Sequence, residues 1–329
     1  MDWQKLSILI TGGTGSFGQK FCDVMMTEHP PRRLIVLSRD ELKQHEMRSR
    51  FPESEQSPMR YFIGDVREKE RLLRAFYGVD IVIHAAALKQ VPTAEYNPLE
   101  AIKTNVMGSA NVIDAAIDCG VKKVIFISTD KAVSPVNLYG ATKLCAEKLF
   151  IAARAYAGGK KTRFAVVRYG NVVGSRGSVV PFFLEKRHTG TLPITDPRMT
   201  RFWITLDHGV RFVVRCLESM QGGETFVPRI PSMRVVDLAK ALAPECKHEI
   251  VGIRPGEKLH EVLISEEEAP RTRANEDSFV ILPHEDYGPA RANRAHEGSP
   301  VEDGFRYTSE TNSWQLTQQE IAEMVEQAV

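Results

Sequence analysis

A tyrosine and a lysine four residues apart, Tyr139 and Lys143, have the clearest capacity for chemistry in this sequence. The apolar residues of 138–157 recur with a helical period, so the pair would share one helix face. A lysine ammonium beside a phenol favours the phenolate and moves the tyrosine pKa toward neutrality. Such a pair could take the proton of a sugar or alcohol hydroxyl while hydride leaves its carbon. The spacing alone is weak evidence, since pairs on a helix surface show it too.

A short apolar run, 124–127, precedes that helix and is typical of a buried strand. Thr129, Asp130 and Lys131 follow at the strand end, which is where open α/β sheets bind ligands. Turn and cap formation is the alternative interpretation of these polar residues.

A glycine-rich loop near the start of the chain supports a nucleotide-binding fold. Glycines 12, 15 and 18 lie between an apolar strand, 6–10, and a helical stretch. Glycine permits the tight turn and the close approach of a pyrophosphate to the backbone at the helix N-terminus. We therefore predict a dinucleotide site, with a structural glycine loop as the alternative. Its loop residues are Gly12, Thr14, Gly15, Ser16, Phe17 and Gly18.

The second predicted strand, 34–37, indicates which dinucleotide binds. It ends without the acidic residue that usually binds the ribose of NAD. Ser38, Arg39 and Lys43 can instead hold a 2′-phosphate, which favours NADP. Asp40 is expected to cap the next helix.

Further cofactor contacts are expected at the ends of the third and fourth strands, 61–63 and 81–83. Asp65, beside Val66, can accept a hydrogen bond from the adenine amine or cap a helix. His84 is interpreted as a core histidine. Past it, small residues would let the ribose and nicotinamide pass, and the lysine beyond them could meet a phosphate or sugar. These residues are Ala85, Ala86, Ala87 and Lys89. Thr104 and Asn105, in the middle of a helix expected from 97 to 119, either brace this loop or face solvent.

Strands alternate with helices through about residue 170, so we expect an α/β fold with a Rossmann-like doubly wound parallel sheet. Residues 1–170 would form the cofactor domain, and 204–222 would return to it. Residues 171–203 and 223–329 would form a smaller substrate lobe, with 266–300 irregular and exposed. Arg201 and Arg254 lie on turn-rich segments and suit a second diphosphate, although scattered surface arginines are the alternative.

Composition excludes several classes. The net charge of +1 gives no reason to expect a nucleic-acid or membrane partner, and no run of apolar residues is long enough to span a bilayer. The N-terminus enters a strand at once, so we expect no signal peptide. No metal site is expected. The five cysteines have no disulfide or Cys-x-x-Cys pattern and indicate a reducing cytoplasm. They are Cys22, Cys119, Cys145, Cys216 and Cys246.

With these motifs in register, the chain resembles an extended short-chain dehydrogenase/reductase. It further resembles the inverting UDP-N-acetylglucosamine 4,6-dehydratases, which open the pathway to pseudaminic acid. The resemblance runs from residue 6 to about 265 and leaves the role of the tail open. Gln90 departs from the histidine expected in its loop. The most specific blocks are 38–43, 85–92, 94–104, 128–143, 168–183, 193–207 and 254–262.

The resemblance implies NADP as cofactor, UDP-N-acetylglucosamine as substrate and a homohexamer. Tyr139, helped by Lys143, would deprotonate the 4-hydroxyl, and Thr129 would bond the 4-oxygen. Lys131 would handle the carbon 5 proton, and Asp130 would protonate the departing 6-hydroxyl. We expect a lowered Lys131 pKa, from partial desolvation and the nearby Lys143. The implied substrate contacts are Lys89, Thr129, Asn171, Val180, Pro181, Thr195, Met199, Arg201, Arg254 and Glu257.

Two alternatives remain at this point. One is a retaining dehydratase or an epimerase of the same UDP-sugar. Retaining dehydratases commonly have Glu after the Asp, where this chain has Lys131, and an epimerase needs no acid like Asp130. The other is a non-catalytic NADP-sensing regulator, which would commonly lose the tyrosine or the lysine that this chain keeps.

Overall fold

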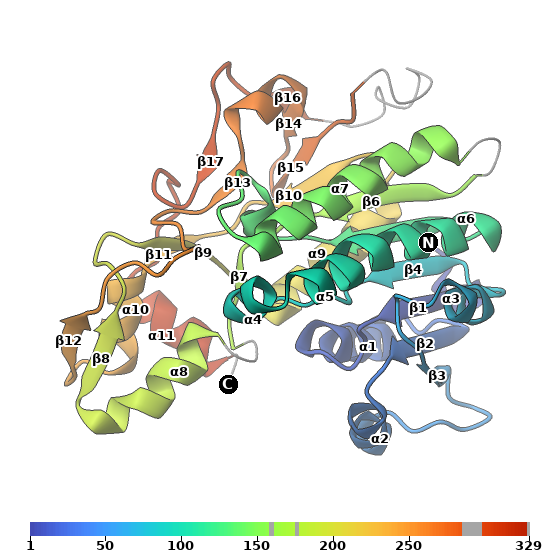
Figure 1. Cartoon of the computed structure of the whole chain (residues 1–329), viewed down its shortest axis with the longest axis horizontal. Helices are drawn as coiled ribbons and strands as arrows, with labels where there is room; N and C mark the ends of the chain where they lie inside the picture. The colour runs from blue at the N-terminus through green and yellow to red at the C-terminus, as the bar shows by residue number, and fades with distance from the viewer. Residues whose placement is uncertain (158–160, 175–177, 285–297, 328–329) are drawn as a thin grey trace.

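A large sheet forms the centre of the molecule (Figure 1). The computed structural model describes residues 1–157, 161–174, 178–284 and 298–327. Within these ranges ten strands form the sheet, and the seven from β10 to β3 run parallel. In spatial order they are β16 (Ser299–Pro300), β14 (Thr272–Ala274), β15 (Ser278–Ile281), β10 (Thr225–Pro228), β6 (Arg163–Val167), β5 (Lys123–Ile127), β4 (Ile81–His84), β1 (Ser7–Thr11), β2 (Arg33–Ser38) and β3 (Met59–Ile63).

Helices cover both faces, which is why the central strands are apolar throughout. Ile8 and Ile10 of β1 point into the core beneath α1 (Ser16–Glu28) and α9 (Leu206–Ser219). Leu9, between them, points into the opposite core, beneath α3 (Lys69–Phe76), α6 (Gly108–Asp118) and α7 (Leu138–Tyr156). The doubly wound parallel sheet is therefore confirmed, and α9 packs against α1 as expected. The other elements of this region are η1 (Trp3–Lys5), α2 (Glu41–Arg50), α4 (Val91–Tyr96), α5 (Pro98–Ile102), a π-helical turn η2 (Lys103–Met107) and η3 (Asp130–Ala132).

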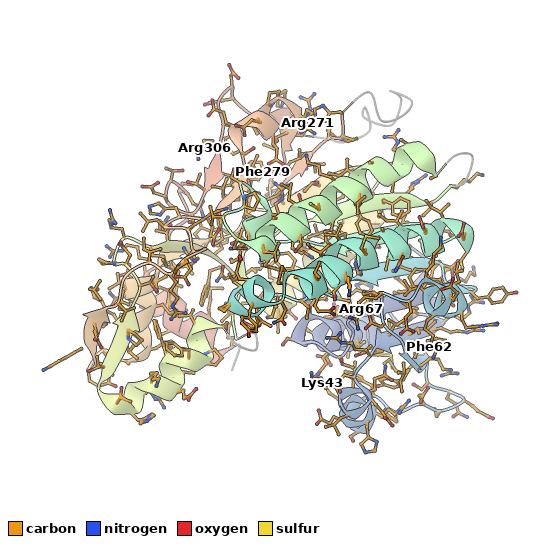
Figure 2. The ribbon with its side chains drawn as sticks, in the orientation of Figure 1. Lys43, Phe62, Arg67, Arg271, Phe279 and Arg306 are labelled. Carbon is orange, nitrogen blue, oxygen red and sulfur yellow. The ribbon has the colours of Figure 1, made fainter. Side chains whose placement is uncertain are left out.

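The prediction of an irregular exposed segment over 266–300 is wrong for its described part. After a short helix, η5 (Glu266–Arg271), β14 and β15 add antiparallel strands beside β10. β15 is buried, and its Phe279 packs in the main core. Figure 2 labels Phe279 and also Phe62 of β3, toward the opposite edge of the sheet. The many charges misled the prediction, because Glu268 is not solvated but pairs with the buried Arg168 at 3.0 Å. Residues 285–297 of the predicted segment lie outside the described residues.

A smaller lobe lies at the lower left of Figure 1. It packs a hydrophobic core of its own. Leu192, Trp203, Leu238 and Ile321 meet in that core. β10, β14, β15 and β16 fall within the span assigned to this lobe but belong to the main sheet. The remaining elements are β7 (Asn171–Val172), α8 (Val179–Lys186), η4 (Arg187–Thr189), β8 (Thr191–Ile194), β9 (Thr200–Ile204), β11 (Ser232–Arg234), α10 (Val235–Leu242), β12 (Lys247–Ile250), β13 (Val262–Ile264), β17 (Tyr307–Thr308) and α11 (Gln318–Glu326).

None of the helices in the described ranges is both long enough and apolar enough to cross a membrane.

Candidate active site

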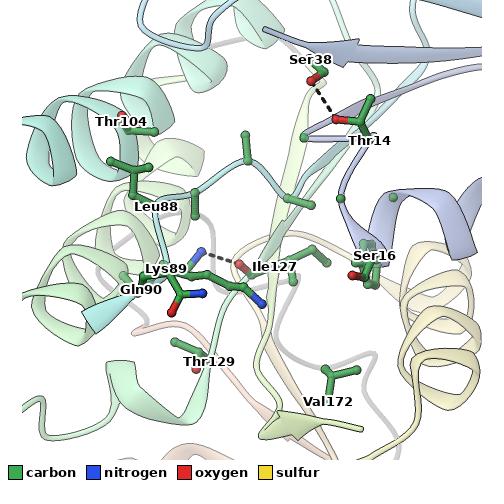
Figure 3. Close-up of a pocket in the computed structure, with 18 of the residues that line it drawn as sticks. Thr14, Ser16, Ser38, Leu88, Lys89, Gln90, Thr104, Ile127, Thr129 and Val172 are labelled. Carbon is green, nitrogen blue, oxygen red and sulfur yellow. Dashed lines mark hydrogen bonds between the residues drawn. The ribbon is translucent and has the colours of Figure 1, made fainter. Parts of the chain in front are cut away.

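A cavity of about 670 Å³ opens at the carboxyl ends of β1, β2, β4 and β5 (Figure 3). This is the edge at which an open parallel sheet binds ligands. The cavity brings together most of the predicted site residues. These are Gly12, Thr14, Gly15, Ser16, Phe17, Gly18, Ser38, Arg39, Asp40, Lys43, Asp65, Val66, Ala85, Ala86, Ala87, Lys89, Thr104, Thr129, Lys131, Tyr139, Lys143 and Asn171.

The glycine loop has the shape that a dinucleotide needs. Gly12 has φ +67°, and a Cβ there would lie 2.8 Å from the Cα of Ala86. A Cβ on Gly18 would lie 2.3 Å from the carbonyl oxygen of Gly13, so α1 can begin this close to the loop only with glycine. The backbone is thus open at the N-terminus of α1, where a pyrophosphate is best held. The residues present fit a nicotinamide dinucleotide.

The end of β2 is polar and carries no acidic residue. The Ser38 and Thr14 hydroxyls are 2.9 Å apart (Figure 3). Asp40 caps α2 by accepting a hydrogen bond from the Lys43 backbone N–H at 3.0 Å, as predicted, and also pairs with the Lys43 ammonium. The Arg39 side chain is 55% exposed, so its guanidinium is accessible to a ligand phosphate.

The Asp65 carboxylate is already paired. It accepts a hydrogen bond from the Arg67 backbone N–H at 3.0 Å and pairs with the Arg67 guanidinium at 2.7 Å. Arg39 lies 3.6 Å from the same carboxylate. An adenine amine would share this acceptor with Arg67.

Lys143 is held at the floor of the cavity. Its ammonium donates to the carbonyl of Ile127 at 2.6 Å and lies 3.9 Å from the centre of the Phe126 ring. Burial lowers the pKa of Lys143 to about 7. Burial also raises the pKa of Tyr139 to about 12, because desolvation outweighs the favourable charge of Lys131. The predicted shift of Tyr139 toward neutrality is therefore absent from this structure.

Asp130 and Lys131 form a charged pair at the start of η3. The Lys131 ammonium lies 3.1 Å from Oδ1 of Asp130, and the Thr129 hydroxyl donates to the same oxygen at 2.8 Å. Asp130 is fully buried, and burial raises its pKa. For Lys131, burial alone would lower the pKa, but Asp130 and the carboxylate of Glu261 outweigh it and raise the pKa. The predicted lowering of the Lys131 pKa is therefore wrong, because a second carboxylate faces the ammonium.

Two contacts fix α7 against the rest of the site. Asn105, in the π-helical turn, exchanges hydrogen bonds with the Leu88 backbone at 2.8 and 2.9 Å and donates to Thr142 at 3.0 Å. This confirms the bracing role considered for Asn105, and π-helical turns are frequent at functional sites. Asn137, the N-cap of α7, donates to the carbonyl of Gly256 at 2.7 Å.

His84 has no part in the cavity. It is fully buried between the hydroxyls of Thr11 and Ser109, at 2.8 and 3.1 Å, and burial lowers its pKa to about 3. The interpretation as a core histidine is confirmed. Among the described residues there is no cluster of histidine, cysteine or acidic side chains that could hold a metal.

Several predicted substrate residues do not line this cavity. Val180 and Met199 are buried in the core of the lobe. The Arg201 guanidinium donates to the carbonyls of Thr200, Lys258 and Leu259 at 2.7 to 3.1 Å. Its donors are thus largely engaged within the protein. The others are Pro181 and Arg254, which are exposed, and Thr195 and Glu257, which are half-buried. Residues 175–177 of the resembling block 168–183 lie outside the described residues.

Sequence reasoning missed two groups of site residues. Tyr169, Val172 and Leu206 line the cavity, and only their position within the resembling blocks 168–183 and 193–207 pointed to them. Glu261 and Lys258 lie beside Lys131 and Asp130, and only their position within the resembling block 254–262 pointed to them.

Comparisons with known proteins show the family of this chain. Residues 8–283 match the family described as "Polysaccharide biosynthesis protein". The chain is 54% identical to UDP-N-acetylglucosamine 4,6-dehydratase (inverting) of Campylobacter jejuni, over 98% of each chain. It is 43% identical to UDP-glucose 4-epimerase of Rickettsia massiliae, over 84% of this chain and 82% of the relative.

Solved structures show the same fold. The structure of Pen from Bacillus thuringiensis superimposes with a TM-score of 0.88 and 34% identity, over 99% of this chain and 100% of that one. DesIV of Streptomyces venezuelae, a dTDP-glucose 4,6-dehydratase, superimposes with a TM-score of 0.68 and 24% identity, over 77% and 87% of the two chains.

Proposed function

Since this chain belongs to the polysaccharide biosynthesis protein family of extended short-chain dehydrogenases/reductases, we propose that it is an inverting UDP-N-acetylglucosamine 4,6-dehydratase. Its product would be UDP-2-acetamido-2,6-dideoxy-β-L-arabino-hex-4-ulose, formed by net loss of water, so the enzyme is a hydro-lyase. That product would be the first intermediate toward pseudaminic acid. The observation that carries the proposal is the Asp130–Lys131 pair, of which Lys131 lines the cavity together with Tyr139, on a chain 54% identical to such an enzyme.

The cofactor we propose is NADP. Family neighbours bind a nicotinamide dinucleotide, and the end of β2 offers Ser38, Arg39 and Lys43 to a 2′-phosphate. When bound, the nicotinamide supplies a hydride acceptor that is regenerated within each turnover.

Tyr139 is the residue that we propose takes the proton of the 4-hydroxyl. Because the pKa of Tyr139 is about 12 in this structure, its phenolate must be stabilised before it can accept that proton. The ammonium form of Lys143, held at the cavity floor, would stabilise the phenolate once substrate and cofactor close the site. Thr129 would bond the 4-oxygen once its hydroxyl proton turns from Oδ1 of Asp130 toward the substrate.

Asp130 and Lys131 would carry the elimination. A proton that moves across their 3.1 Å contact converts the ion pair into a carboxylic acid and an amine. The amine of Lys131 can then remove the carbon 5 proton, which the 4-ketone acidifies, and Asp130 can protonate the departing 6-hydroxyl. Lys131, now an ammonium, can return a proton to the other face of carbon 5, which inverts that centre.

The epimerase relatives define the competing function. A 4-epimerase needs no acid for the 6-hydroxyl. Here Asp130 is fully buried, and no described residue donates a hydrogen bond to its Oδ2. Burial raises the pKa of Asp130, which favours a protonated carboxyl that could act as this acid, and this supports the dehydratase.

The uridine diphosphate would lie on the lobe side of the cavity. Asn171 lines the cavity, and Arg254 and Glu257 lie on the loop that Asn137 ties to α7. Thr195 and Lys89 complete the proposed set. By resemblance we propose a homohexamer.

The test is to incubate the purified enzyme, supplied with NADP, with UDP-N-acetylglucosamine in heavy water. We expect a product lighter by one water, with deuterium at carbon 5 and the L configuration by proton NMR. UDP-N-acetylgalactosamine would instead identify an epimerase, and a D-configured 4-keto product would identify a retaining dehydratase. Either product, or no turnover, would refute the proposal.

A further inference from the structure

Behind the Asp130–Lys131 pair lies a second acidic residue, Glu261, immediately before β13. Its Oε1 is 3.3 Å from the Lys131 ammonium, which therefore lies between two carboxylates. Glu261 is 2% exposed and is absent from the described lining of the cavity. Lys131 lines the cavity, whereas neither of its two carboxylate partners does, so both carboxylates approach Lys131 from the protein side.

Glu261 also has two cationic neighbours of its own. Arg201 Nε lies 3.8 Å from Oε1, and Lys258 Nζ lies 3.9 Å from Oε2. Burial opposes the charged form of Glu261, but Lys131, Arg201 and Lys258 outweigh it and lower the pKa of Glu261. The environment of Glu261 thus favours its carboxylate form, whereas burial raises the pKa of Asp130.

The C-terminal tail fixes the backbone of Glu261. Ser309 donates its backbone N–H to the Glu261 carbonyl at 2.8 Å, and its hydroxyl accepts from the Glu261 N–H at 2.9 Å. The same hydroxyl is 2.7 Å from that of Thr200 on β9, and β17 pairs with β13 (Figure 1). The tail, to which the sequence assigned no role, thus holds the residue whose carboxylate contacts Lys131.

We propose that Glu261 is a positioning residue: its carboxylate holds the Lys131 side chain beside Asp130, and its negative charge keeps on that pair the one proton that passes from Lys131 to Asp130 before the elimination. This rests on the proposed dehydratase function. Two carboxylates in different environments take different protonation states, and that separation divides the acid role from the counter-ion role. Without the negative charge of Glu261, Asp130 would remain the counter-ion of Lys131 at 3.1 Å and would lose its proton more readily.

The test is Glu261→Gln, which keeps the side-chain shape and the backbone bonds to Ser309. We expect kcat to fall about 100-fold, with KM for UDP-N-acetylglucosamine within about threefold and NADP affinity unchanged. Asp130 and Lys131 would both lose protons at lower pH, so the alkaline limb of the pH–rate profile should move down by about one unit or more. Glu261→Asp should recover at least tenfold of the loss.

The matched control is Glu310→Gln, in the same tail. Its carboxylate is 60% exposed and faces His260 at 3.5 Å, so wild-type kinetics are expected. Equal losses in Glu261→Gln and Glu261→Asp without a profile shift would show a purely structural role, and wild-type kinetics in Glu261→Gln would also overturn the proposal. If Glu261→Gln does not fold, Ser309→Ala is the replacement variant. It should lose less kcat than expected for Glu261→Gln and should show the same downward shift of the alkaline limb of the pH–rate profile. A pH–rate profile without that shift would count against the proposal. In the same series, turnover of the wild-type enzyme tests the proposed function. The role of Glu261 is tested separately, by the ratio of each variant's kcat to that of the wild type.

Discussion

Gly140, the third residue of α7, is where the two halves of the catalytic site touch. A Cβ on Gly140 would lie 2.1 Å from the carbonyl oxygen of Lys131 and 3.1 Å from Cβ of Pro135. Ordinary contact begins near 3.4 Å, so in Gly140→Ala α7 and η3 must separate by about 1.3 Å. Overpacking of this kind costs about 1–3 kcal/mol of unfolding free energy. The same movement separates Tyr139 from Lys131, and a misplacement of about 1 Å costs roughly 100-fold in rate.

The assay compares kcat, NADP affinity and urea unfolding of Gly140→Ala with those of the wild type. We expect lower kcat and stability but retained NADP affinity, because the glycine loop at residues 12–18 is distant in the chain and lies across the cavity. Gly209→Ala in α9 is the matched control. Its added Cβ would meet only a side-chain atom of Ile204 at 3.7 Å, so helix propensity should stabilise it by up to about 1 kcal/mol. If Gly140→Ala has the kcat and stability of the wild type, the contact between η3 and α7 does not set the distance between Tyr139 and Lys131, and the reasoning is refuted.

Two further predictions concern the cofactor and the buried lysine. Arg39→Ala should cost about 1.5–3 kcal/mol in NADP binding and little in NAD binding, as loss of a charged hydrogen-bond partner does; calorimetry with both cofactors checks this, and equal losses would reject the NADP assignment. Burial lowers the pKa of Lys143 from 10.5 to about 7. Between pH 7 and pH 10.5 the unfolded chain therefore binds more protons at this residue than the folded chain does, so the contribution of Lys143 to the unfolding free energy rises with pH. Lys143→Met should therefore be inactive, and its unfolding free energy should rise with pH less steeply than that of the wild type, by up to about 1.4 kcal/mol per unit from pH 7.5 to 9. Parallel slopes in urea titrations would show that Lys143 is not desolvated.

The nucleotide fold could be predicted because its signals are local. Each parallel strand is buried on both faces and is therefore a continuous apolar run, such as 124–127 or 34–37. The glycines of the first loop are required by close backbone contacts between neighbouring segments, such as Gly18 against Gly13. The Asp40 cap needs only the three residues that follow it. These features depend on residues that are close together in the sequence, so they can be predicted from it.

The strands β14 and β15 were not predicted, nor was the π-helical turn within the helix predicted at 97–119. β15 is a short strand among charged residues, and only its pairing with β10 and the burial of Phe279 make it part of the sheet. The π-helical turn at 103–107 interrupts an otherwise helical stretch so that Asn105 can reach Leu88 and Thr142. Both depend on partners distant in the sequence.

The sequence by itself determined which side chains are present at the catalytic strand end, since Thr129, Asp130 and Lys131 are consecutive and Tyr139 and Lys143 share a helix turn. Only the tertiary structure decided their charge states. The pKa of Lys131 depends on Glu261, 130 positions further along the chain, whose backbone is fixed by Ser309 from the C-terminal tail. Electrostatic energy depends on the distance between charges and on burial, and neither is encoded in the spacing of residues along the chain.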